Sequence, residues 1–126
     1  MSRMPEEMPL RVYVEYRVVP ERRGEYESRM RAWQARVAQL PVVSYSRYEG
    51  LDQPHLMVEE YLVPDAAAYR LLKDLRTGRR EPDAPWQIGT CVQGGWEKVH
   101  VWAFVPRGGN EAGDKEQAGG EQEGRR

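Results

Sequence analysis

Few side chains in this sequence can carry acid–base or nucleophilic chemistry, because the chain has two histidines and one cysteine. His100 is the more informative histidine. It lies midway along the alternating segment 96–105, on the side that also carries Trp102. An imidazole titrates near neutral pH, so it can accept a proton from a substrate or ligate a haem iron. His100 is therefore a candidate general base or haem ligand. The alternative is a structural histidine hydrogen-bonded to a carboxylate.

Two adjacent carboxylates stand in a segment that is predicted to be a strand. Glu59 and Glu60 must point to opposite faces, so one of them enters the protein interior or a lumen. A buried carboxylate has a raised pKa unless a cation pairs with it, and Arg17, Arg47 and Lys98 are the candidate partners. A buried structural ion pair and a proton-accepting group are both compatible with the sequence, which leaves open which glutamate faces the lumen.

Aromatic residues accompany these ionisable groups. Those that could stack on a flat ligand are Tyr13, Tyr45, Tyr48, Trp96 and Trp102. The alternative for this set is packing at an interface between subunits. Trp33 recurs at helical spacing and is expected in the core, whereas Trp86 is expected to fix an irregular connection.

Metal and disulfide chemistry is not indicated. The single cysteine, Cys91, excludes an intrachain disulfide and a cysteine-based zinc site. It is expected to be a small buried residue rather than a nucleophile. His55 and His100 do not have the spacing of metal ligands, and His55 is expected to lie in a turn. We therefore expect no metal site.

The elements that position these residues begin with a strand. Strict alternation over residues 10–19 places Tyr13, Glu15 and Arg17 on one face and apolar residues on the other. Pro20 then opens a helix, because a proline fits the first helical turn, and Pro41 ends it. The apolar stripe of this helix is Tyr26, Met30, Trp33, Val37 and Leu40.

The second half repeats the pattern. Residues 42–49 and 55–63 are predicted to form two strands of a hairpin. Asp65 is the predicted N-cap of a second helix, and Gly78 is its predicted left-handed stop. The stripe of this helix is Ala68, Leu71, Leu72 and Leu75, and Arg76 lies in its last turn. Two further elements are predicted, a short helix over residues 86–92 and a last strand over residues 96–105.

The resulting order, βαββαβ, predicts an α+β, ferredoxin-like fold: a four-stranded antiparallel sheet with two helices on one face. The strands 10–19 and 55–63 should be central. The uncovered face would then expose Trp96, Trp102 and Phe104 together, which is a larger apolar patch than a typical monomer carries. A second copy of the sheet would cover this face, so we expect a dimeric α/β barrel with aromatic and ionisable side chains in its lumen.

This pattern resembles the dimeric α/β-barrel (ferredoxin-like) superfamily, and most of all its antibiotic-biosynthesis-monooxygenase-like branch. The resemblance covers residues 9–106. It rests on the order of the elements, on the first strand VYVEY with its following helix start PE, and on the last strand VHVWAF. It implies a homodimer that binds a small aromatic or quinone-like compound and catalyses cofactor-free oxygenation or proton transfer.

The resemblance also directs attention to particular residues. The expected catalytic residues are His100, Trp102 and a carboxylate, taken from Glu15, Glu59 or Glu60. The expected ligand-binding residues are Tyr13, Arg17, Tyr45, Arg47, Glu59, Glu60 and Trp96. No cofactor is expected. Haem is the alternative, although haem-degrading members of the superfamily carry a histidine on the second helix and residues 65–77 contain none. A non-catalytic dimeric interaction or stress protein is the other alternative.

Length and charge bound these hypotheses. The chain has 126 residues, enough for one domain, and its 19 basic and 20 acidic residues give a net charge of -1. That balance argues against binding nucleic acid or an anionic membrane by bulk charge. With no signal peptide or spanning apolar run in the sequence, a cytoplasmic location is expected. We expect residues 1–8 to be a flexible N-terminus, 9–106 the domain, and 107–126 a disordered tail that lacks aromatic residues.

Overall fold

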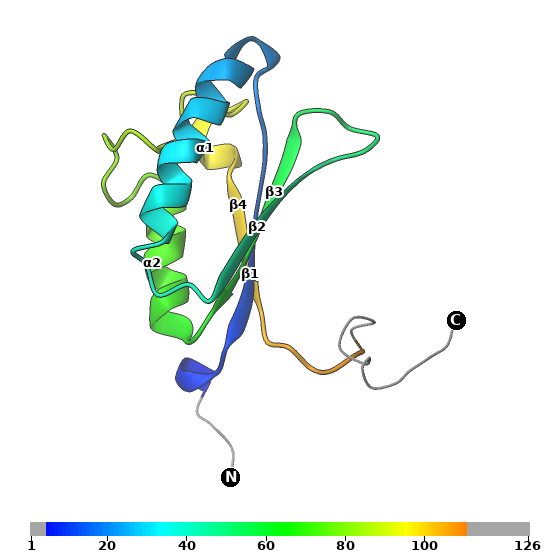
Figure 1. The fold of residues 1–126 in the computed structure, drawn as a ribbon, viewed down its shortest axis with the longest axis vertical. Helices are drawn as coiled ribbons and strands as arrows, with labels where there is room; N and C mark the ends of the chain where they lie inside the picture. The colour runs from blue at the N-terminus through cyan, green and yellow to red at the C-terminus, as the bar shows by residue number, and fades with distance from the viewer. Residues whose placement is uncertain (1–4, 111–126) are drawn as a thin grey trace.

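The computed structural model describes residues 5–110 and has the predicted βαββαβ order (Figure 1). Its strands and α-helices are β1 (Leu10–Arg17), α1 (Arg23–Val37), β2 (Ser44–Glu49), β3 (Leu56–Val63), α2 (Ala66–Arg76) and β4 (His100–Phe104). The four strands form one antiparallel sheet in the order β2-β3-β1-β4. The prediction that the first and third strands are central is confirmed.

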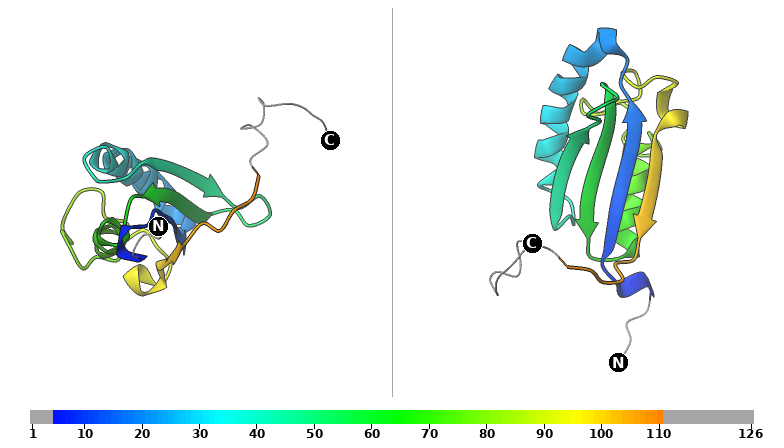
Figure 2. Two further views of the ribbon diagram at one scale, coloured as in Figure 1. Left: turned by 90° about the horizontal axis from the view of Figure 1, so that it is seen from below. Right: turned by 90° about the vertical axis from the view of Figure 1, so that its right-hand side faces the viewer.

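Both helices lie on one face of the sheet, and the other face carries no helix (Figure 2). The alternation of β1 decides which residues each face receives. Val12, Val14 and Tyr16 are buried beneath the helices, whereas the residues between them are only half-buried. We call the uncovered side the open face. Its residues on β1 and β4 are Arg11, Tyr13, Glu15, Arg17, His100, Trp102 and Phe104.

The residues predicted to begin or end the two helices do so at three of the four helix ends. Pro20–Arg22 forms a 3-10 turn that leads into α1. The side chain of Asp65 caps α2, since its Oδ1 accepts a hydrogen bond from the backbone N–H of Ala68 at 2.8 Å. Gly78 follows α2 with φ 77°, the left-handed region that glycine adopts without strain. The helix α1, however, ends at Val37, before the predicted end near Pro41.

The segment between α2 and β4 departs from the sequence prediction. Residues 86–92 form turns and not a helix, and the last strand begins at His100 and not at Trp96. Trp96 instead lies in a 3-10 turn, Gly95–Lys98, and its indole fills the space beside two glycines. A Cβ atom on Gly78 or Gly89 would come within 2.4 or 2.6 Å of the indole, so both positions need glycine.

The same connector is fixed to the rest of the domain by polar contacts. The buried Gln87 side chain donates from Nε2 to the carbonyl oxygens of Leu75, Arg80 and Glu81 at 3.0–3.1 Å. Further along, the backbone N–H of Gln93 donates to the carbonyl of Arg17 at 2.8 Å. These bonds bring residues 91–93 alongside the end of β1, where β4 no longer pairs with it.

The core confirms most of the predicted burial. Trp33, Trp86 and Cys91 are all buried, and the two indoles lie 4.9 Å apart. Residues 5–7 form a 3-10 turn, residues 107–110 form neither helix nor strand, and residues 1–4 and 111–126 lie outside the described part of the chain. The predictions of a flexible N-terminus and a disordered tail therefore stay predictions. No helix between residues 5 and 110 is long and apolar enough to cross a membrane.

Candidate functional site

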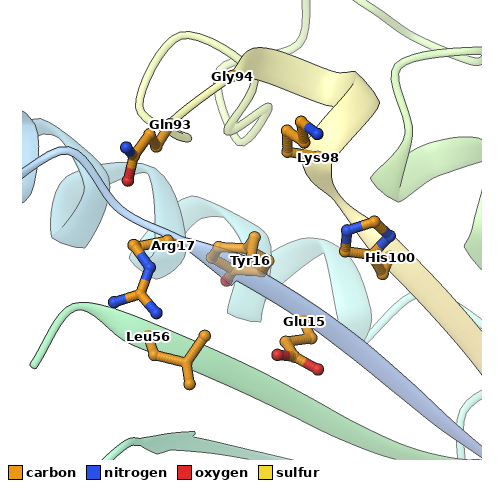
Figure 3. A pocket seen from close by; sticks show the side chains of 8 residues that line it. All are labelled: Glu15, Tyr16, Arg17, Leu56, Gln93, Gly94, Lys98 and His100. Atoms are coloured by element: carbon orange, nitrogen blue, oxygen red, sulfur yellow. The ribbon is translucent and has the colours of Figure 1, made fainter. Parts of the chain in front are cut away.

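An open cleft of about 510 Å³ lies on the open face, where β1, β4 and the connector meet (Figure 3). The connector supplies its upper rim through Gln93 and Gly94. The residues that line the cleft are Glu15, Tyr16, Arg17, Leu56, Gln93, Gly94, Lys98 and His100. Four of these eight residues, Glu15, Arg17, Lys98 and His100, carry an acidic or basic side chain, so groups that can exchange protons or bind an ion border the cleft.

Glu15 and His100 are direct cross-strand neighbours within this cleft. They occupy paired positions of β1 and β4, and both project from the open face (Figure 3). Directly opposed residues of an antiparallel pair have Cβ atoms about 4.5–5.5 Å apart. A carboxylate and an imidazole at this spacing can share a proton directly or through one water molecule. Strand alternation alone places both residues on the open face, and the register of β1 and β4 sets them opposite each other.

Two cations flank the pair. Arg17 lies one pleat beyond Glu15 on β1, and its Nη2 donates to Gln53 Oε1 at 2.9 Å. Lys98 lies in the 3-10 turn before β4 and extends along the cleft wall near His100 (Figure 3). Both side chains are exposed, and together they outweigh the single carboxylate of Glu15. The cleft therefore favours a ligand with a negative charge or a readily lost proton.

An aromatic strip continues from the cleft along β1 and β4. The imidazole of His100 stacks on the indole of Trp102, with ring centroids 5.7 Å apart and planes 19° from parallel. Trp102 is paired with Tyr13, whose ring meets Phe104 edge to face at 5.7 Å. Trp102 and Phe104 are 45% and 53% exposed, which is high for side chains of this size. A flat molecule beside His100 would thus find a stacking surface next to it.

Glu60, and not Glu59, is the glutamate on the open face. Its two carboxylate oxygens accept hydrogen bonds from the hydroxyl groups of Tyr13 and Tyr48, each at 3.0 Å, and Arg11 Nε lies 3.9 Å away. Partial burial and the contact with Glu60 raise the pKa of Tyr13. Glu60 is therefore held by two phenols at some distance from the cleft and does not line it.

Glu59 points to the opposite face and is fully buried beneath the helices. Its cation is Arg76 of α2, also fully buried, and none of the predicted partners Arg17, Arg47 and Lys98. Arg76 Nε and Nη2 donate to the two oxygens of Glu59 at 3.0 and 2.5 Å. The hydroxyls of Tyr16 and Tyr61 donate to the same carboxylate. The interpretation of a buried structural ion pair is confirmed, with a different partner.

Besides Glu59, three predicted ligand-binding residues lie away from the open face. Tyr45 and Arg47 share the helix side of β2, because they pair with Tyr61 and Glu59 of β3. Tyr45 stacks on Tyr61 at 4.9 Å, and Arg47 Nη2 binds Glu27 Oε1 of α1 at 3.0 Å. The two predicted ligand-binding residues therefore lie on the side of the sheet opposite His100.

Trp96 is the third of these residues. It leaves the open face because the strand starts four residues later than predicted, and its Nε1 donates to Gln87 Oε1 at 3.2 Å. Its indole lies beside Gly89 of the connector and Gly78, two residues past the end of α2.

The described residues offer no alternative metal or nucleophile site. Between residues 5 and 110, no group of three or more His, Cys, Asp and Glu side chains could hold a metal ion. Burial raises the pKa of the Cys91 thiol, which disfavours the reactive thiolate. His55 lies in the hairpin turn with φ 73°, next in sequence to the cleft residue Leu56, but it does not line the cleft and its Nδ1 is 3.1 Å from Arg23 Nη1.

Comparison with solved structures bears on this arrangement. An antibiotic biosynthesis monooxygenase structure matches 79% of this chain and 99% of its own, with a TM-score of 0.61 and 18% identity. SnoaB, a cofactor-independent oxygenase from Streptomyces nogalater, matches 81% of this chain and 96% of its own, with a TM-score of 0.59 and 15% identity. A conserved protein from Methanosarcina mazei matches over 82% of this chain and 97% of its own length, with a TM-score of 0.62 and 12% sequence identity. The chain has the ferredoxin-like fold of the antibiotic biosynthesis monooxygenase structures.

The likeness is one of fold. No protein-family profile matches the sequence, and no curated protein is similar enough to match it. At such low identity, the monooxygenase-like fold does not by itself carry an activity to this chain, because one fold supports many chemistries. The assignment of function therefore depends on the residues of the cleft.

Proposed function

We propose that the protein binds a small, planar, acidic aromatic compound in the cleft and removes a proton from it with His100. The observation that carries the proposal is the placement of Glu15 opposite His100 in a cleft flanked by Arg17 and Lys98. A phenol or an activated ring CH₂ group is the kind of acid that this set can ionise. The cations would stabilise the resulting anion, and Trp102 would stack beside its ring.

Each residue has a role that its position supports. His100 accepts the proton, because it is the imidazole that lines the cleft and imidazole is the side chain that most often serves as a general base. Glu15, in the paired position on β1, would accept a hydrogen bond from the other ring N–H in the ligand complex and so stabilise the imidazolium that forms. Arg17 and Lys98 hold the anionic oxygen of the ionised ligand at the rim. These are proton-transfer steps that need no cofactor.

Oxygenation is the reaction that we infer for the ionised compound. A carbanion conjugated with a phenol can give electrons to dioxygen directly, forming a hydroperoxide that then loses water. The balance is CH₂ plus O₂ giving C=O plus H₂O, so no external reductant is required. The cofactor-independent oxygenase among the similar structures supports this reaction class.

The open face also supports a homodimer, which we propose as the working form. Trp102, Phe104 and Tyr48 are each about half exposed on one sheet surface. Large aromatic side chains bury about 150–250 Å² each, and a contiguous patch of this kind is the usual mark of an interface. A second sheet packed on this face would exclude water from the cleft and strengthen its electrostatics.

The test uses 1,8-dihydroxyanthrone as a probe, because it is flat, acidic and has an activated CH₂ group. We expect it to quench tryptophan fluorescence and to consume dioxygen with release of the quinone. His100→Ala and Glu15→Gln should lower the rate of oxygen uptake while the proteins remain folded. His55→Ala is the matched control, since it removes the other histidine outside the cleft.

Three results would contradict the proposal. One is oxygen uptake no faster than the spontaneous rate. Another is an equal loss of rate in His100→Ala and His55→Ala. The third is a Soret band on titration with haem that His100→Ala abolishes, which would assign the histidine to haem ligation instead.

A further inference from the structure

Three tyrosine hydroxyls converge in the core between the sheet and the helices. Those of Tyr16 and Tyr61 donate to the two different oxygens of Glu59. The hydroxyl of Tyr26 lies 2.7 Å from that of Tyr16. Because the proton of Tyr16 is already directed at Glu59, Tyr26 is the donor in this hydrogen bond and the oxygen of Tyr16 is the acceptor. All four side chains are at most 2% exposed. Two phenols thus share one buried base, and a third reaches it through the first.

These phenols belong to a longer run of aromatic rings. Trp33 Nε1 donates to the hydroxyl of Tyr61 at 2.8 Å, and Trp86 lies 4.9 Å beyond Trp33. On the other side, Tyr45 stacks on Tyr61 with ring centroids 4.9 Å apart. Tyr45 is partly exposed and lines a surface pocket of about 300 Å³ between α1 and β2. The rings therefore connect the solvent at Tyr45 with the innermost part of the core.

The network costs more than a packed core requires. Removing the charges of Glu59 and Arg76 from water is expensive, and apolar residues of similar volume are often as stabilising as a buried ion pair. Arg76 Nη1 is also buried without a hydrogen-bond partner, which adds to that cost. Neither group touches the cleft on the open face.

We propose that Tyr16 and Tyr61 are a redox-active pair that gives up an electron to a one-electron oxidant and passes its phenolic proton to Glu59. The oxidant class is a partly reduced oxygen species, such as a peroxyl radical, arriving at Tyr45. The electron reduces the oxidant, the O–H proton moves to the facing carboxylate oxygen, and a neutral tyrosyl radical remains. An external thiol or ascorbate returns one electron, and the proton goes back from Glu59.

The surroundings favour tyrosine over tryptophan as the oxidised residue. The guanidinium carbon of Arg76 lies 4.1 Å from the ring centroid of Trp33, and a fixed cation there disfavours a tryptophan radical cation. A tyrosyl radical is neutral and avoids this repulsion. Burial, and next the charge of Glu59, raise the pKa of Tyr16 and of Tyr61 well above the ordinary value. The phenols therefore stay protonated, and the electron can leave only if a hydrogen-bonded base takes the proton at the same time.

The proposal goes beyond the proposed cleft chemistry: Tyr16 lines the cleft, but its hydroxyl is bonded to Glu59 in the core and takes no part in that chemistry. It concerns the helix side of the sheet, and His100→Ala should leave it unchanged. The experiment oxidises the full-length protein with photogenerated tris(bipyridine)ruthenium(III), freezes it, and records the electron paramagnetic resonance spectrum. We expect a long-lived tyrosyl signal in the wild-type protein, and loss of most of that signal in the double variant Tyr16→Phe and Tyr61→Phe.

The matched control is the double variant Tyr13→Phe and Tyr48→Phe. It removes the two phenols that donate hydrogen bonds to Glu60. The control thus removes the same number of phenol-to-carboxylate hydrogen bonds, but on the open face instead of in the core. We expect the long-lived signal to persist in this control. An unchanged signal in the Tyr16 and Tyr61 variant, or an equal loss in the control, would overturn the proposal.

A second measurement keeps the test decisive if the core variants do not fold. In the wild-type protein, the radical should be reduced by ascorbate more slowly than a free tyrosyl radical, because Tyr16 and Tyr61 are buried. Reduction at the rate of free tyrosyl radical would place the oxidised residue at the surface and refute the assignment.

Discussion

Replacing Arg76 by methionine should unfold the domain at moderate temperature, because it leaves Glu59 charged and buried. The substitution removes two of the four hydrogen bonds that the carboxylate accepts, those from Nε and Nη2, and keeps those from Tyr16 and Tyr61. Breaking one side of a buried ion pair costs about 3–5 kcal/mol. Small domains have a total stability of about 5–15 kcal/mol, so this single change removes a large share of it.

The assay is urea unfolding followed by circular dichroism, supported by thermal unfolding. A loss of this size should lower the thermal midpoint by more than about 10 °C. Lys73→Met is the matched control on α2. Lys73 is half-exposed, with its Nζ 6.0 Å from the Tyr69 ring, and its loss should cost no more than about 0.5–1 kcal/mol.

A double-mutant cycle separates the charge pair from the packing of the arginine. Glu59→Gln with Arg76→Met removes both charges and keeps an acceptor oxygen for the tyrosine hydroxyls. It should be more stable than Arg76→Met alone by about 2 kcal/mol. A loss below about 1 kcal/mol in the single variant, or no recovery in the double, would refute the argument that an unpaired buried charge dominates.

Three further expectations follow. If the open face is a dimer interface, the midpoint of thermal unfolding should rise with protein concentration, and Trp102→Glu should abolish this rise. Sedimentation that shows a monomer at micromolar concentration would contradict the dimer. Gly89→Ala should cost about 1–3 kcal/mol in urea unfolding, because its Cβ would meet the indole of Trp96 at 2.6 Å, and Gly24→Ala, with nothing within 4 Å, should not destabilise. Burial, followed by the charge of Glu59, raises the pKa of Tyr26 to about 12. Its contribution to stability should hold below pH 10 and fall as the pH rises from 10 to about 12, and Tyr26→Phe should flatten this fall in an alkaline unfolding titration.

The regular elements could be predicted from the sequence because their signals are local. Alternation of Val12, Glu15 and their neighbours is enough to form β1 and assign its two faces. The cap at Asp65 and the stop at Gly78 act within one helical turn, so no distant contact is needed to recognise them. Strand order and alternation then place Glu15 and His100 on the same face of neighbouring strands, whereas the register that pairs them is seen only in the structure.

The connector could not be predicted in the same way. Trp96 continues the alternation of the last strand, and nothing local distinguishes it from Trp102. Its place depends on space beside Gly78 and Gly89, two glycines that only the folded chain brings together around the indole. The side of the cleft formed by Gln93 depends on the same tertiary contacts. Sequence reasoning therefore places the strand residues of the cleft, such as Glu15 and His100, but not the connector residues that border it.

The partner of Glu59 has a signal in the sequence. Arg76 follows Leu72 by four residues and therefore continues the apolar stripe of α2 toward the sheet. In the last turn of a helix, an arginine is more often a surface cation that complements the helix dipole, so its position there does not by itself indicate burial. A basic residue on the buried stripe and an acidic residue on the buried side of β3 are each anomalous, and together they indicate a pair.

The contrast between the carboxylates explains why we assign the chemistry to the open face. A carboxylate can accept about four hydrogen bonds, and Glu59 accepts four from Tyr16, Tyr61 and Arg76. It has no capacity left to bind a substrate. Glu15 lines the cleft and is paired in register with His100. A substrate can therefore compete for a group at the cleft without breaking the core, and a reaction in which protons enter and leave with solvent belongs on that side of the sheet.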